Sequence, residues 1–311
     1  MPQIYRRALA ASVALLAPSC SALKTFDALV PKDSDGVRVA TAVPYGDGPR
    51  RKLDIYAPRR SSSDGALRPI IIFFYGGSWA SGTRAGYAFA GRALAAQGFV
   101  TVIPDYRLVP EVRYPGFVED SAAAVRWVAQ HGRDYGGDPD SIVLVGHSAG
   151  AYIAAMLALD SRWLGPDRRA VKGFAGLAGP YDFAPFDIAA SRAAFGNWSR
   201  PAETQPISWA SAGDPPTLLL VGDRDRTVMP RNSVALARKL ADAGVAVKTL
   251  HYPQLGHVGM ILSFARPFRG RSTVLADVIS FAKQVTSANM PAAEERAKTL
   301  SVVSQPSRYR R

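Results

Sequence analysis

Apolar and mixed segments alternate along most of the chain, and their lengths separate two kinds of element. Short apolar or alternating runs predict strands at about 37–43, 51–57, 69–75, 99–104, 141–146, 171–178, 216–222 and 246–252. Longer runs predict helices at about 84–97, 117–131, 148–160, 231–243 and 271–286. Fully apolar runs such as 69–75 are typical of parallel strands that are buried on both faces. The alternation predicts an α/β fold, with a mostly parallel, doubly wound sheet flanked by helices.

A short glycine-rich motif lies between one of these strands and the next helix. Residues 146–150 read Gly-His-Ser-Ala-Gly, after the apolar run 141–145 and before the helix-forming run 151–159. A strand, a tight Gly-x-Ser-x-Gly turn and a helix are the context of a nucleophile elbow, in which the serine sits in a strained turn. The helix N-terminus directs unpaired N–H groups toward an anion that forms at the serine. We therefore predict that Ser148 is a catalytic nucleophile.

A second glycine-rich turn follows the strand at 69–75. Residues 75–79 read Tyr-Gly-Gly-Ser-Trp, and consecutive glycines at the end of a strand leave backbone N–H groups free to face a ligand. Acyl transfer places a negative charge on the former carbonyl oxygen, which preorganised backbone donors stabilise. We predict an oxyanion hole formed by the N–H groups of Gly77, Ser78 and Ala149.

Two aspartates follow the strand at 216–222 and are candidates for the triad acid. A carboxylate at this edge can accept a hydrogen bond from a catalytic imidazole and fix its tautomer. We favour Asp225, because Asp223 is nearer the strand end and is expected to brace the turn through local side-chain hydrogen bonds.

The chain contains four histidines, which are the candidates for the catalytic base. His147 lies within the elbow and is expected to point away from the chemistry, His131 lies near a helix end, and His251 lies in or just after the last strand. His257 lies on a glycine-flanked loop beyond that strand, from which a side chain can reach back to Ser148. We therefore predict a triad of Ser148, Asp225 and His257.

The order serine, aspartate, histidine is typical of α/β-hydrolases, and the chain resembles that superfamily over residues 37–285. It looks most like small esterases with a His-Gly-Gly-x-Trp loop, of the feruloyl-esterase-like, acetyl-esterase-like, hormone-sensitive-lipase-like, prenylcysteine-methylesterase-like and kynurenine-formamidase-like types. The resemblance rests on the segments 53–58, 75–79, 105–108, 135–139, 146–150, 222–228 and 256–257. Two residues depart from the pattern: Tyr75 replaces the first histidine of the loop, and Ser78 replaces the third glycine of lipase-like members.

The resemblance implies a catalytic domain that cleaves carboxylic esters of short-chain or aromatic acids through an acyl-enzyme, without a metal or an organic cofactor. An amidase or formamidase with the same triad, or a non-catalytic binding module on the same fold, is the alternative. The side chain of Ser78 narrows the approach of an acyl group, so a long-chain lipase is not expected.

The segment 181–213 is too long for a simple connection between strands and contains six aromatic residues. It is either an insertion that lies over the active site as a lid, or a peripheral helix that packs its aromatic side chains into the core. Aromatic side chains predict an acyl or alcohol pocket that contains Tyr75, Trp79, Tyr87 and Trp198.

The N-terminus predicts export. Arg6 and Arg7 precede a ten-residue apolar run that is too short to span a bilayer as a helix, which is typical of a secretory signal over residues 1–22. Cys20 follows this run in a context that resembles a lipoprotein cleavage box, so we predict its lipidation; cleavage after Ala22 is the alternative. The protein is thus expected in the periplasm or on a membrane through a lipid anchor. With a single cysteine, no internal disulfide is possible.

A net charge of +13 and a pI near 10.1 raise the question of nucleic-acid binding. The arginines are scattered and no recognised nucleic-acid motif is present, so we expect a small-molecule ester rather than nucleic acid as the ligand. Residues 287–311 form a basic tail that is predicted to be disordered.

Overall fold

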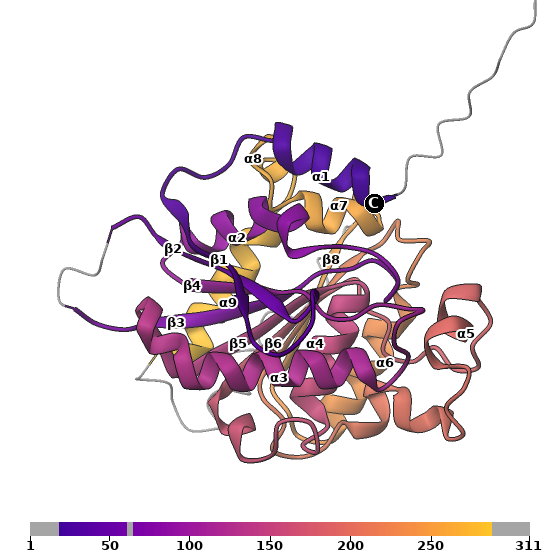
Figure 1. The fold of residues 1–311 in the computed structure, drawn as a ribbon. Coiled ribbons are helices and arrows are strands. Elements are labelled where there is room, and N and C mark those ends of the chain that lie inside the picture. Colours follow the sequence, from indigo (N-terminus) through magenta and orange to yellow (C-terminus); the bar gives the residue numbers. More distant parts are fainter. Residues whose placement is uncertain (1–18, 61–64, 288–311) are drawn as a thin grey trace, which may run out of the picture.

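The computed structural model describes residues 19–60 and 65–287, and these form one eight-stranded sheet with helices on both faces (Figure 1). The order of the strands across the sheet is β1-β2-β4-β3-β5-β6-β7-β8. Only β2 runs antiparallel to its neighbours, and the strands from β4 to β8 are parallel. The strands are β1 (Gly36–Pro44), β2 (Lys52–Pro58), β3 (Arg68–Phe74), β4 (Val100–Pro104), β5 (Gly137–His147), β6 (Val171–Leu177), β7 (Thr217–Gly222) and β8 (Val247–Tyr252).

Helices α2 and α9 cover one face of the sheet, and α3, α4 and α6 cover the other (Figure 1). The α-helices are α1 (Ser19–Leu29), α2 (Ala88–Ala95), α3 (Gly116–His131), α4 (Ala149–Leu159), α5 (Ala189–Phe195), α6 (Arg231–Asp242), α7 (His257–Leu262), α8 (Arg266–Arg269) and α9 (Val274–Thr286). Short 3₁₀ helices are η1 (Arg84–Tyr87), η2 (Gly132–Tyr135), η3 (Gly165–Ala170), η4 (Pro201–Thr204) and η5 (Pro206–Trp209). Every helix in the described parts of the chain is too short or too polar to cross a membrane.

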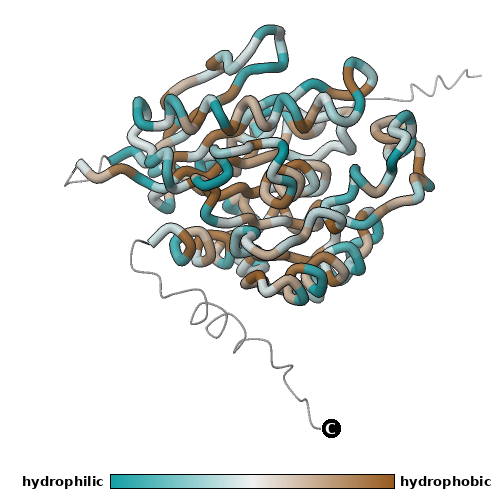
Figure 2. The backbone as a smooth tube through the Cα atoms, turned by 90° about the horizontal axis from the view of Figure 1, so that it is seen from below, coloured by the Kyte–Doolittle hydropathy of each residue, from teal (hydrophilic) through white to brown (hydrophobic). Residues whose placement is uncertain are grey.

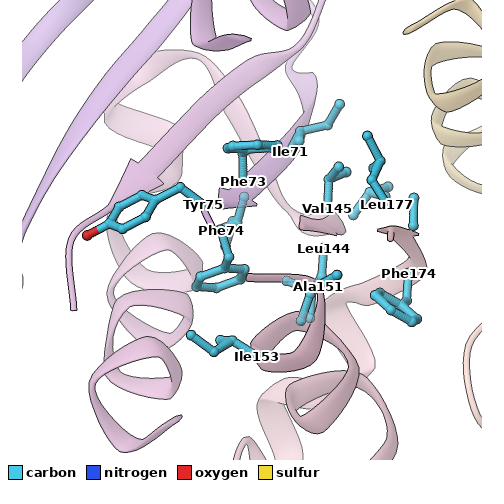
Figure 3. Close-up of a cluster of buried hydrophobic side chains, with 14 of the residues drawn as sticks. Ile71, Phe73, Phe74, Tyr75, Leu144, Val145, Ala151, Ile153, Phe174 and Leu177 are labelled. Atoms are coloured by element: carbon cyan, nitrogen blue, oxygen red, sulfur yellow. The ribbon is translucent and has the colours of Figure 1, made fainter. Parts of the chain in front are cut away.

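The core forms because the central strands contain runs of buried apolar residues, such as 70–74 on β3 and 142–145 on β5. Phe73 and Phe74 on β3 point to opposite faces of the sheet, as do Leu144 and Val145 on β5 (Figure 3). Helix α4 is fully buried along its length, so it needs no polar face. Hydrophilic segments lie mostly at the outer loops and helix surfaces (Figure 2). The central strands are thereby held rigidly, and their carboxyl ends present the connecting turns at one edge.

The predicted α/β fold is confirmed, with a strand at each predicted position. The predicted helix 84–97 is divided into η1 and α2, and the predicted helix 271–286 begins only at Val274. Helices α1, α7 and α8 were not expected, whereas α5 lies in the segment 181–213, for which a peripheral helix was one of the two alternatives. Helix α1 overlaps the end of the predicted signal: Phe26 packs edge-on against Phe89 at 5.4 Å, and Asp27 accepts a 2.8 Å hydrogen bond from the N–H of Phe89.

Residues 1–18 and 288–311 lie outside the described residues. The predicted export signal and disordered tail lie largely in these ranges, and nothing in the structure tests the lipidation of Cys20, so all three stay predictions.

Candidate active site

Ser148 occupies a sharp turn between β5 and α4. Its backbone angles are φ 55° and ψ −125°, a conformation that residues with a side chain rarely adopt. The glycines beside it are required by close packing: a Cβ on Gly146 would lie 2.3 Å from the carbonyl oxygen of Gly150, and one on Gly150 would lie 2.0 Å from that of Phe74. The N–H of Ser148 donates to the carbonyl of Leu177 at 2.9 Å, which ties the turn to β6. The structure thus has the backbone of a nucleophile elbow.

The side chains of Ser148, His257 and Asp225 are connected by two hydrogen bonds. His257 Nε2 lies 2.8 Å from Ser148 Oγ, and His257 Nδ1 lies 2.8 Å from Asp225 Oδ2. His257 is the first residue of α7, and Asp225 follows β7. The turn after β7 and the start of α7 therefore converge on the elbow, and the structure brings together the three residues predicted as a triad.

The carboxylate of Asp225 is held from two sides. Its Oδ2 faces His257, while its Oδ1 accepts hydrogen bonds from the N–H groups of Thr227 at 2.8 Å and Val228 at 2.9 Å. Burial alone would raise the pKa of this carboxyl, but the hydrogen bonds from His257 and the two N–H groups outweigh it and lower the pKa below its usual value. Asp225 is therefore ionised and fixed in orientation at neutral pH.

The expected role of Asp223 was wrong. Its Oδ1 lies 2.6 Å from His251 Nδ1, so its carboxylate pairs with an exposed histidine rather than bracing the turn. The local backbone hydrogen bonds that were expected of Asp223 are made by Asp225.

His147 was expected to point away from the chemistry, and this too was wrong. Its Nε2 lies 3.1 Å from the carbonyl oxygen of His257, and the two rings are 4.9 Å apart. Burial, with a smaller effect of His257, lowers the pKa of His147 to about 3. At neutral pH the ring is uncharged and has a single N–H group, which at Nε2 can donate to the carbonyl oxygen of His257. Sequence reasoning missed this contact because strand periodicity gives a direction for a side chain but not its partner.

The remaining histidine, His131, is the last residue of α3, as expected for a histidine near a helix end. Its ring stacks on Trp127 at 4.5 Å, and its Nδ1 lies 2.9 Å from the carbonyl of that residue.

The predicted oxyanion donors lie in two turns that meet at Ser148. Gly77, Ser78 and Trp79 have φ angles of 138°, 53° and 58°, so the turn after β3 is wound into the left-handed region. A Cβ on Gly77 would lie 2.2 Å from the carbonyl oxygen of Ser81, which excludes larger residues. Among the described residues, the N–H groups of Gly77, Ser78 and Ala149 have no hydrogen-bond acceptor. They are therefore free to donate to a ligand.

A cavity of about 330 Å³ adjoins the elbow. Ser148, Ala149 and Ser78 form part of its wall together with apolar side chains. The apolar contributors include Trp79, Phe183, Pro185, Ile188, Val228 and Met229. This volume is at the lower end of the range for small-molecule sites.

The sequence of this chain was compared with models of known protein families. The family model described as BD-FAE matches residues 53–240, which is more than half of the chain. The chain belongs to the BD-FAE family of α/β-hydrolases.

The relatives of this BD-FAE chain are named as esterases. It is 32% identical over 244 residues to esterase LipI of Mycobacterium tuberculosis, covering 69% of this chain and 75% of the relative. It is 31% identical over 268 residues to a probable isoprenylcysteine alpha-carbonyl methylesterase of Oryza sativa, covering 78% of this chain and 63% of the relative. The chain spans between 24% and 63% of the length of the plant methylesterases that it matches.

A solved structure also shares the fold. Esterase B from Lactobacillus rhamnosis superposes with a TM-score of 0.73 at 21% identity, covering 90% of this chain and 95% of that chain. The relatives above are named as esterases, and this solved structure shows a shared fold.

Of the four aromatic residues predicted for the substrate pocket of this BD-FAE chain, the structure brings only Trp79 to the cavity. Tyr75 is fully buried between the rings of Tyr87 and Tyr106, at 5.4 and 4.9 Å. Figure 3 shows its ring directed away from the cluster on β5. Its hydroxyl donates to Asp105 Oδ1 at 2.7 Å and accepts from Arg50 at 2.9 Å. Tyr75 and Tyr87 are therefore core residues beneath the oxyanion turn.

Trp198, the fourth predicted pocket residue, packs edge-on against Tyr114 at 4.9 Å. Its Nε1 donates to Glu203 Oε2 at 3.3 Å. It therefore stabilises the 181–213 segment rather than lining the cavity.

The segment 181–213 combines the two arrangements that were expected as alternatives. Pro185 and Ile188 line the cavity, so the residues just before α5 cover the site. Phe195, at the end of α5, is buried against Trp79 with ring centroids 4.7 Å apart. The cover is thus attached to the core through Phe195, next to the ring that forms the cavity wall.

Proposed function

We propose that this chain is a serine esterase in which Ser148 is the nucleophile, His257 the general base and Asp225 the residue that orients it. The observation that carries the proposal is the pair of 2.8 Å hydrogen bonds from Ser148 through His257 to Asp225. In the first step Ser148 Oγ bonds to the ester carbonyl carbon while its proton passes to His257 Nε2. His257 then gives this proton to the departing alcohol oxygen, and an acyl-enzyme remains.

Deacylation reverses these roles. A water molecule gives a proton to His257 and bonds to the acyl carbon, after which the bond to Ser148 Oγ breaks and the serine regains its proton. In both steps the unpaired N–H groups of Gly77, Ser78 and Ala149 are suited to stabilise the oxyanion. Because these donors are held by the backbone, they need no reorganisation as the charge forms.

The substrate class that we propose is an ester of a short-chain or aromatic acid. The cavity of about 330 Å³ offers little space for a long acyl chain. Trp79 and Phe183 stack at 5.9 Å, so the wall beside Ser148 presents flat aromatic surface.

The test is labelling with a fluorophosphonate, together with hydrolysis of acetyl, butyryl and feruloyl esters, by the wild type and Ser148→Ala. We expect the variant to lose labelling and to lose turnover by at least about 10⁴-fold, with its thermal unfolding unchanged. Wild-type turnover in a folded Ser148→Ala would contradict the proposal. Labelling of the wild type without ester turnover would instead favour amide or formamide substrates.

A further inference from the structure

Two arginines line the same cavity as Ser148 and have no role in the proposed triad. Arg226 follows Asp225 directly, and Arg231 is the first residue of α6. Both are exposed, so they stand where the cavity meets solvent. Among the described residues, neither guanidinium has a hydrogen bond or a carboxylate partner.

This lack of partners distinguishes them from the partly buried arginines of the molecule, whereas exposed arginines outside the cavity, such as Arg224 and Arg238, are also unpaired among the described residues. Arg84 is paired with Asp54 at 2.8 Å, Arg107 with Asp120 at 2.8 Å, and Arg269 with Asp33 at 2.7 Å. Arginines that are packed into this structure are thus generally neutralised, whereas the two at the cavity keep all of their donors free for a ligand.

The charge of the cavity wall is correspondingly positive. Asp187 is the one acidic side chain among the lining residues, against Arg226 and Arg231. Asp225 lies nearby but is occupied by His257, and the first turn of α6 contains no acidic residue. An anionic group bound here would therefore find an excess of positive charge.

The wall between and around the two arginines is apolar. Val228 and Met229 lie between them in the sequence and line the cavity, and Met229 is 50% exposed. Ile188, from the covering segment, also lines the cavity and is 62% exposed. Such surface suits a substrate with an apolar body, while a guanidinium fork suits a carboxylate, which it can bind through two parallel hydrogen bonds.

We propose that the preferred substrates are esters that carry a carboxylate in addition to the scissile ester, with Arg226 and Arg231 binding that carboxylate at the mouth of the cavity. This inference rests on the proposed esterase function and adds the chemical class of its substrate.

The experiment compares matched charged and neutral esters. On the acyl side the pair is 4-nitrophenyl hydrogen adipate and 4-nitrophenyl hexanoate; on the alcohol side it is 4-acetoxybenzoate and its methyl ester. For each pair, the ratio of kcat/KM for the charged ester to that for the neutral one is measured. We expect the wild type to favour the charged member of at least one pair by about tenfold, as for one charge-assisted contact. The responding pair identifies the side that carries the carboxylate.

The variant is Arg226→Gln/Arg231→Gln, and the control is Arg224→Gln/Arg238→Gln, which removes the same charge from exposed positions outside the cavity lining. Arg226→Gln/Arg231→Gln should lower the ratio of kcat/KM for charged over neutral ester about tenfold, and the control variant should leave this ratio unchanged. Added salt should also lower the wild-type ratio, because exposed charges are screened.

A wild type that hydrolyses the neutral esters but shows no preference for a charged one would overturn the inference and leave the proposed esterase function intact. An equal loss of the ratio in the control variant would also overturn it, since general surface charge would then explain the effect. A wild type that hydrolyses none of the four esters would refute the proposed function, and the inference with it.

Discussion

Two histidine–aspartate pairs lie at the carboxyl edge of β7 and β8, built from neighbouring residues. Asp223 and His251 are 2.6 Å apart, and Asp225 and His257 are 2.8 Å apart. The side chains of the first pair are 38% and 45% exposed, whereas those of the second are 1% and 12% exposed. His257 also contacts Ser148, and His251 has no such third partner among the described residues.

A short contact between histidine and aspartate therefore does not by itself define a catalytic pair. In water the first pair is screened and its geometry is held only by the two side chains. The second is fixed by backbone donors to Asp225, by the strained elbow of Ser148 and by the contact of His147 with the His257 carbonyl. Replacing corresponding members of the two pairs separates these cases.

The largest difference is expected for the histidines. His257→Ala removes the proposed base, and kcat should fall by on the order of 10⁵-fold or more. His251→Ala removes an exposed side chain whose hydrogen-bond partner is Asp223 and not Ser148, and kcat should change by less than about twofold. Steady-state hydrolysis of a nitrophenyl ester measures both. Comparable losses in the two variants would mean that the surface pair takes part in catalysis.

The aspartates should show a smaller difference. Asp225→Asn keeps the shape of the side chain but removes its charge and permits the wrong tautomer of His257, so kcat should fall by about 10³- to 10⁴-fold. Asp223→Asn should leave kcat nearly unchanged. The pH dependence of kcat is a further measurement: because the pKa of Asp225 is lowered, its carboxylate stays ionised in mildly acidic solution. If Asp223→Asn were the severe variant, the two roles would be exchanged.

The sequence predicts the fold of this molecule well because buried parallel strands have an unambiguous pattern. The run Ile70-Ile71-Ile72 and its neighbours can be placed only as a central strand, and the residues that follow such strands must gather at one edge. The convergence of Ser148, Asp225 and His257 could be predicted from that topology together with the Gly-x-Ser-x-Gly motif and the positions of the histidines and aspartates. The distinction between Asp223 and Asp225 was predicted correctly for the contact with His257, but for a partly wrong reason.

Side-chain partners that depend on packing could not be predicted. Tyr75 stands next to the oxyanion turn in the sequence, yet its ring is stacked in the core and its hydroxyl is held by Asp105 and Arg50. A strand pattern cannot show this, because Tyr75 follows the last residue of β3 and its side chain is no longer directed by the alternation of the strand. The two unpaired arginines at the cavity were missed for the same reason, since pairing is a property of the fold and not of composition.

The smallest predicted effect concerns His147, whose buried ring contacts the backbone of the Asp225–His257 pair and not the exposed Asp223–His251 pair. Its pKa is about 3 in the folded protein, against an ordinary value of 6.5. Between these values the ring is protonated in the unfolded chain but not in the folded one, so the contribution of His147 to stability is constant above about pH 6.5 and falls as the pH is lowered. From these pKa values, the loss between neutral pH and about pH 5 should be about 2 kcal/mol.

Denaturant unfolding of the wild type and of His147→Gln at the two pH values measures this loss. Glutamine keeps an amide donor but does not titrate, so its unfolding free energy should change less over this range, by the same amount of about 2 kcal/mol. The other three histidines are common to both proteins and cancel in the difference. An equal pH dependence in the two proteins would show that His147 accepts a proton readily in the folded state. In that case burial around the elbow would not keep the ring neutral, and the donor to the carbonyl of His257 would be a charged imidazolium rather than a neutral imidazole.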